Sequence, residues 1–151
     1  MVRIPRRLRR GGCHLKYLYL LSTNFIISGM DLKNILQSLS KQYPNRKIII
    51  NSKNFPTEIL CEVEPTASHP NYSVAIAVID KTHPHKHIKT TETYEVIRGI
   101  LTLNIDGNIT VLNTGEKITI KPNQVHEAEG KETWVRVISK PGWTKVDHLF
   151  I

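Results

Sequence analysis

Apolar and polar residues alternate along most of the chain after residue 45, which indicates short β-strands rather than helices. The alternation is clear at 58–63, where Ile59, Cys61 and Val63 fall on one side of an extended chain and glutamates fall on the other. Turn residues separate the apolar stretches. We therefore predict strands at Lys47–Asn51, Glu58–Val63, Tyr72–Asp80, Thr93–Arg98, Ile100–Ile105, Ile109–Leu112, Lys117–Lys121, Val125–Ala128, Thr133–Ser139 and His148–Ile151.

One helix is predicted before the strands. Asp31 is a good N-cap, apolar residues follow at positions 32, 35, 36 and 39, and Pro44 ends the segment. Asp106-Gly107 lies between two predicted strands and is typical of a tight hairpin turn. Many short strands and one helix predict an all-β sandwich or barrel, formed by residues 30–151 as a single domain.

Residues 1–29 form a separate basic and apolar leader, which we expect to have little structure. It carries six basic residues and no acidic ones, and its apolar part is interrupted by Ser22, Thr23 and Asn24. An export signal has the same order of basic and apolar parts, but no clear cleavage site follows. We prefer an appended leader, with Met30 as the true start, over an export signal or a nucleic-acid-binding arm.

The net charge of +8 does not indicate a nucleic-acid partner, because the leader supplies most of it. Residues 30–151 contain 15 basic and 13 acidic residues, whereas phosphate binding needs basic charge clustered on the domain itself. No run of about twenty apolar residues predicts a membrane span. Cys13 and Cys61 do not form a disulfide framework, so a reducing compartment, the cytoplasm, is expected.

Histidines concentrate in His83-Pro-His85-Lys-His87. Residues i and i+2 of an extended chain share a face, so His85 and His87 can point to one place, with Glu92 shortly after them. His126 lies on another predicted strand. Three nitrogens and one oxygen suit divalent Mn, Fe, Ni, Cu or Zn. The alternative is a solvated histidine-rich loop. For residues 83–87 taken alone, this alternative explains the histidines at least as well as a metal site does.

The joint spacing of these residues resembles the two cupin motifs. His85-x-His87-x4-Glu92-x6-Gly99 is similar to the first motif, although Ile79 stands where a leading glycine is expected. Gly115-x5-Lys121-x-Asn123-x2-His126 is similar to the second. There the chain departs from the family pattern at three positions, Lys121 for proline, Asn123 for the turn glycine and Gly130 for the final asparagine. Asparagine is the best non-glycine residue for a left-handed turn.

The resemblance implies a cupin double-stranded β-helix, a jelly-roll barrel, with one divalent metal (Mn, Fe, Zn or Ni) inside. Carried over by position, the ligands become His85, His87, Glu92 and His126. His83 shares the parity of His85 and is a candidate catalytic or substrate-contacting residue, or else a loop histidine. Tyr94 is the other catalytic candidate, or else a core residue. The resemblance also implies a homodimer.

Four further residues have expected roles outside the metal-binding group. We expect Arg98 and Arg136 to lie on a solvated face, with binding of an anionic substrate as the alternative. Trp143 and His148 lie near the C-terminus, where small barrels often pair, so packing is their expected role.

Three functions fit this set of residues. The first is a metal-dependent enzyme acting on a small polar metabolite, such as a sugar or sugar phosphate, similar to mannose-6-phosphate isomerase-like cupins. The second is an Fe(II)-dependent dioxygenase. The third is a non-catalytic module that binds a small ligand, because a fold alone does not imply a function.

Overall fold

A computed structural model describes residues 29–151 of the chain. Apart from Gly29, the leader predicted for residues 1–29 lies outside the described residues, as does Cys13. The elements in chain order are α1 (Leu32–Gln42), β1 (Lys47–Ile50), β2 (Glu58–Glu64), β3 (Ser73–Lys81), β4 (His85–His87), β5 (Thr91–Arg98), β6 (Ile100–Ile105), β7 (Asn108–Asn113), β8 (Lys117–Ile120), β9 (His126–Lys140) and β10 (His148–Phe150).

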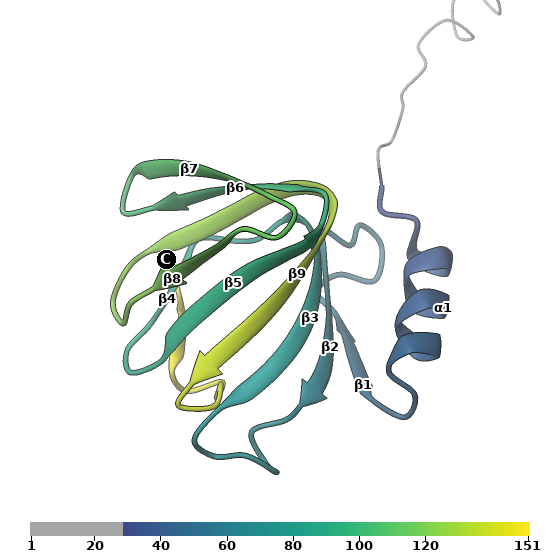
Figure 1. Ribbon diagram of the computed structural model, residues 1–151, viewed down its shortest axis with the longest axis horizontal. Coiled ribbons are helices and arrows are strands. Elements are labelled where there is room, and N and C mark those ends of the chain that lie inside the picture. Colours follow the sequence, from purple (N-terminus) through teal and green to yellow (C-terminus); the bar gives the residue numbers. More distant parts are fainter. Residues whose placement is uncertain (1–28) are drawn as a thin grey trace, which may run out of the picture.

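The ten strands form one antiparallel sheet that curls on itself, as Figure 1 shows. Strand β9 is its central member and pairs with β3, β4, β5 and β6. The predicted all-β architecture is confirmed. The two strands predicted at 125–128 and 133–139 are one continuous strand, because the chain stays in the sheet through an irregularity in the register of β3 against β9.

Alternation along the strands produces two cores, one inside the curled sheet and one outside it. On β3, Ala77 and Ile79 point inward, while Ile76 and Val78 point outward. On β9, Val135 and Val137 join the inner core.

Helix α1 covers the outer core, beside β1 and β2 (Figure 1). Asp31 caps it, since its carboxylate accepts a hydrogen bond from the Asn34 N–H at 3.2 Å. Ile35 and Leu39, on the apolar stripe of the helix, are buried in this core. No helix within residues 29–151 is long and apolar enough to cross a membrane.

Strand β2 turns its polar side toward the interior of the sheet. Ile59 and Cys61 face the helix layer, so the opposite residues, Glu58 and Glu62, line an internal cavity. The polar face of β2 therefore lines a cavity rather than the outer surface, which its alternating pattern does not indicate. The consequence is an acidic wall in the cavity.

We predict that Leu39→Ala, at a fully buried position under α1, lowers the free energy of unfolding by about 2–5 kcal/mol. The cause is the cavity left between the helix and β2. Urea denaturation of metal-free protein would measure the change. Gln37→Ala, at an exposed position of the same helix, is the control and should change stability by less than about 0.5 kcal/mol. An equal effect of both substitutions would contradict this packing.

Candidate metal centre

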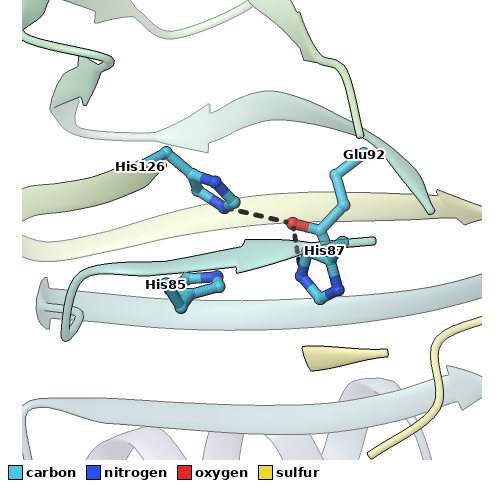
Figure 2. A group of neighbouring side chains, drawn as sticks. All are labelled: His85, His87, Glu92 and His126. Carbon is cyan, nitrogen blue, oxygen red and sulfur yellow. Dashed lines mark ion pairs between the residues drawn. The ribbon is translucent and has the colours of Figure 1, made fainter. Parts of the chain in front are cut away.

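Four buried side chains meet at one end of the sheet interior. They come from three strands, His85 and His87 from β4, Glu92 from β5 and His126 from the start of β9. Each offers one ligand atom, and these atoms lie within 4.8 Å of one another. Figure 2 shows the imidazoles of His87 and His126 directed at the Glu92 carboxylate, with His85 beside them.

Strand pairing produces this convergence. His85 is the register partner of His126 in the β4–β9 ladder, and their ring centroids are 4.1 Å apart. His87 is two residues along β4, on the same face. Glu92 and Tyr94 are likewise two residues apart on β5, and both are buried. Side chains 40 residues apart in sequence are thus neighbours because their strands are.

The turn before His126 is joined directly to the histidine strand. Asn123 has a φ of +66°, the left-handed conformation expected for a residue in the place of the motif glycine. Its backbone N–H donates to the carbonyl of His87 at 2.6 Å. This bond fixes the end of β4 against the turn that leads into β9.

Backbone carbonyls select the tautomer of two of the histidines. His85 Nδ1 lies 2.8 Å from the carbonyl oxygen of His83, and His126 Nδ1 lies 3.2 Å from that of Gln124. A carbonyl only accepts hydrogen bonds, so each Nδ1 carries the proton and each neutral ring leaves a lone pair on Nε2. Burial, with the neighbouring His126, lowers the pKa of His85 to about 4, so that its ring is neutral at neutral pH.

Asp147 lies beside the third histidine, His87, but no hydrogen bond joins them in the described part of the chain. Its carboxylate lies 3.6 Å from His87 Nδ1 and accepts hydrogen bonds from the backbone N–H groups of Lys89 and Thr90, at 2.8 and 3.0 Å. Burial would raise the pKa of Asp147, but the hydrogen bonds from Thr90 and Lys89 lower it below its usual value. Asp147 is therefore a carboxylate that lies beside His87 and holds the chain that follows β4.

The ligand atoms face one another without a bridging group. Glu92 Oε2 lies 3.4 Å from Nε2 of both His87 and His126, and none of these three atoms has a hydrogen-bond partner in the described part of the chain. Glu92 Oε1 is satisfied by the Ser139 hydroxyl at 3.1 Å. Lone pairs that face a carboxylate in a buried place require a cation between them.

A divalent metal ion fits that requirement, since three imidazole nitrogens and one carboxylate oxygen are ordinary donors for first-row metals. A proton can occupy the same position, between the Glu92 carboxylate and the imidazoles of His87 and His126. Burial lowers the pKa of His87, but Glu92 and Asp147 outweigh burial and raise it. Burial likewise raises the pKa of Glu92, but the facing imidazoles of His126 and His87 lower it far below its usual value.

A cavity of about 410 Å³ adjoins the four residues, a size suited to a small molecule. Glu58 and Tyr94 line it together with small residues of β3, Ser73 and Ala75, whose short side chains leave room there. Among the described residues, no lysine or arginine lines this cavity.

Two of the candidates from the sequence lie outside this cavity. Arg98 stacks over the Trp134 ring at 4.7 Å, and Arg136 pairs with Glu95 at 3.0 Å, so both arginines lie on the outer surface as expected. His83 is exposed at the rim, and its backbone carbonyl, not its ring, contacts His85.

Two residues of the site, Asp147 and Glu58, were not singled out from the sequence, and His148 was given another role. Asp147 and His148 come from the C-terminal segment, where His148 is the register partner of His87 in the β4–β10 pair. Packing was the expected role of His148, and the structure places its ring against those of His85 and His87. Glu58 was read as the polar side of its strand.

Comparisons with known proteins support the fold. No family model matches the sequence, and no curated protein matches it. Among solved structures, the Streptomyces nucleoside dehydratase Pac13 is 14% identical with a TM-score of 0.63, covering 72% of this chain and 87% of its own.

Two other solved structures give a similar result. KdgF from Halomonas sp. is 18% identical with a TM-score of 0.53, covering 60% of this chain and 85% of its own. Oxalate decarboxylase from Bacillus subtilis is 14% identical with a TM-score of 0.61, covering 72% of this chain and 31% of its own. At these identities the likeness shows the fold alone. All three are cupin-fold proteins, so the cupin fold expected from the motif spacing is confirmed.

Proposed function

We propose that the chain holds one divalent metal ion through His85, His87, Glu92 and His126, and acts as a metal-dependent, isomerase-like enzyme on a small polar metabolite. The observation that carries the proposal is the buried meeting of these four ligand atoms at the wall of a cavity. The mannose-6-phosphate isomerase-like type stays a prediction. When bound, the metal would supply a Lewis acid that polarises a substrate carbonyl.

The charge of the cavity narrows the substrate class. Glu58, Glu62 and Glu64 line it from β2, where Lys47 pairs with Glu62 at 3.5 Å and His69 lies 3.7 Å from Glu64. Among residues 29–151 no lysine or arginine lines the cavity itself, so a phosphate ester would enter without such a side chain in the lining to bind it. An uncharged sugar or related hydroxy-carbonyl compound therefore suits the cavity better than a sugar phosphate.

Proton transfer in such a reaction needs an acid or base in the cavity, and Glu58 suits this role. Burial raises the pKa of Glu58 to about 7, and the nearby carboxylate of Glu92 adds to the shift. A group with a pKa near the working pH is the most effective proton carrier. We therefore add Glu58 to the catalytic candidates.

Tyr94 and His83 keep different proposed roles. Burial, together with Glu92 and Glu58, raises the pKa of Tyr94 well above 10, so its hydroxyl stays protonated and suits hydrogen bonding to substrate rather than base catalysis. His83 lies at the rim, where its ring can contact a substrate that enters. It is a weaker candidate than Glu58 because it is exposed.

Metal identity, assembly and location are parts of the same proposal. Manganese is the first ion to test, because the Bacillus subtilis oxalate decarboxylase has Mn(II) centres. The homodimer stays a prediction, supported by the exposed apolar side chains of Ile100, Ile109 and Val111 on the β6–β7 hairpin. Cys61 is a buried free thiol, which suits the cytoplasm.

We predict that His87→Ala abolishes metal retention, because it removes the imidazole held between Glu92 and Asp147. Untagged protein would be loaded with Mn²⁺ or Zn²⁺, desalted and analysed by mass spectrometry of the metal, with circular dichroism to check strand content. His69→Ala, at an imidazole stacked on Tyr72 away from the four ligands, is the matched control and should retain the ion. Full retention by His87→Ala would show the ligand assignment to be wrong.

Asp147→Asn should weaken metal binding about 10- to 100-fold, since it removes the negative charge that lies beside His87. Competition with a chromogenic chelator would measure the affinity. The control is Glu129→Gln, which removes an exposed carboxylate on β9 and should leave the affinity unchanged. If both variants bound metal as the wild type does, Asp147 would have no role in holding the ligand.

Metal-loaded protein should interconvert at least one unphosphorylated aldose and ketose in a panel that includes their phosphates, followed by proton NMR. Phosphates should react at least tenfold more slowly, because no lysine or arginine lines the cavity to bind the phosphate group. Glu58→Gln should then lower kcat about 10²- to 10⁴-fold without loss of metal, with Glu129→Gln unchanged.

An unreacted panel would remove the isomerase proposal, and faster reaction of the phosphates would contradict the charge argument. Oxygen consumption by the Fe(II)-loaded protein would favour the dioxygenase hypothesis. Ligand binding without turnover would favour the binding-module hypothesis.

A further inference from the structure

A fourth imidazole lies against the candidate metal centre. His148 begins β10, opposite His87 in the β4–β10 pair. Its ring stacks on that of His85, with centroids 4.3 Å apart and planes at 6°, and it meets the His87 ring edge-on at 4.9 Å. It also lines the cavity. By position alone it could be taken for a fifth metal ligand.

Its hydrogen bonding excludes that role. The indole Nε1–H of Trp143 donates to His148 Nδ1 at 3.2 Å. An indole nitrogen is only a donor, so Nδ1 must present its lone pair and the ring proton must reside on Nε2. His85 and His126 have the opposite arrangement, because carbonyls face their Nδ1 atoms and leave Nε2 free for a metal. A protonated Nε2 has no lone pair to give.

His148 Nε2 is buried and has no hydrogen-bond partner among the described residues. A buried donor left unpaired within a cavity is either a cost to folding or a group kept for a ligand. The residue lines the cavity beside the candidate ligand group, which is the side from which a bound molecule would have to approach this N–H. Phe150, whose ring centroid is 4.6 Å away, packs against the imidazole and limits its freedom to turn.

We propose that His148 is a substrate-binding residue, a neutral hydrogen-bond donor that gives its Nε2–H to an oxygen of the molecule bound at the metal. Trp143 is its positioning residue, because the indole fixes the tautomer. The ligand class is an oxygen acceptor, a carbonyl, carboxylate or hydroxamate group that also reaches the metal. This inference rests on the proposed metal centre, but its first test does not.

The first test is the tautomer in metal-free protein labelled with ¹⁵N-histidine. Long-range ¹H–¹⁵N spectra distinguish protonated from unprotonated ring nitrogens. For His148 we expect an unprotonated Nδ1 and a protonated Nε2, and in Trp143→Phe a loss of that preference. A protonated Nδ1 in the wild type, or no change in Trp143→Phe, would overturn the proposal whether or not the protein binds a metal.

The second test separates donation from ligation, with Zn²⁺ as the metal and acetohydroxamate as the probe. Against a chelator, His148→Phe should hold Zn²⁺ within about threefold of the wild type, whereas a ligand variant loses it. In calorimetry of the Zn²⁺-loaded proteins, His148→Phe should bind acetohydroxamate about tenfold more weakly. His148→Gln, whose side-chain amide keeps a donor near the place of Nε2, should restore most of that loss.

Each outcome of this second test is decisive for His148. A large loss of Zn²⁺ by His148→Phe would make the residue a metal ligand, and unchanged acetohydroxamate binding would leave the N–H without a role. If His148→Phe fails to fold, His148→Gln together with the wild-type tautomer decides the question. Failure of the wild type to hold Zn²⁺ would count against the proposed function, while the tautomer result would still stand.

Discussion

Three imidazoles are buried against one carboxylate, and the protein places no proton donor between them. Glu92 Oε2 faces His87 Nε2 and His126 Nε2 at equal distances of 3.4 Å, inside a sheet that excludes water from these atoms. Such an arrangement costs free energy unless a cation occupies its centre. The neighbouring features of the fold, from the β4–β9 pair to the turn at Asn123, hold these groups together despite that cost.

The group that faces the Nδ1 atom of His85, His126 or His148 determines whether the Nε2 atom of that ring carries a lone pair or a proton. An acceptor there leaves a lone pair on Nε2, as in His85 and His126, and a donor there leaves a proton on Nε2, as in His148. One residue type thus supplies candidate metal ligands and a hydrogen-bond donor within a few ångströms. The difference lies in single hydrogen bonds from backbone carbonyls and from the Trp143 indole.

The cavity beside these groups is acidic rather than basic, which is unusual for a site that would bind a phosphorylated metabolite. Its character comes from β2, whose apolar side is taken by the helix layer, so that Glu58 and its neighbours must face inward. Packing of α1 on the outer face of the sheet therefore determines which side chains line the cavity on the inner face. It places a carboxyl with a pKa near 7 in the substrate cavity.

Local pattern in the sequence was enough for most of the strands, though not for β4 as a strand or for the continuity of β9, and for the helix with its Asp31 cap. The motif spacing was enough to choose Glu92 and the histidines of β4 and β9 as one group. Alternation and fixed motif spacing are short-range properties, so they can be read without the fold. The pattern could not say which face of β2 is inside, because its polar face lines a cavity rather than the outer surface. It could not bring Asp147 and His148 to the site either, since the pairing of β10 with β4 joins segments about sixty residues apart with no local signal. The tertiary structure alone decided those contacts, and with them the protonated nitrogen that each buried imidazole presents.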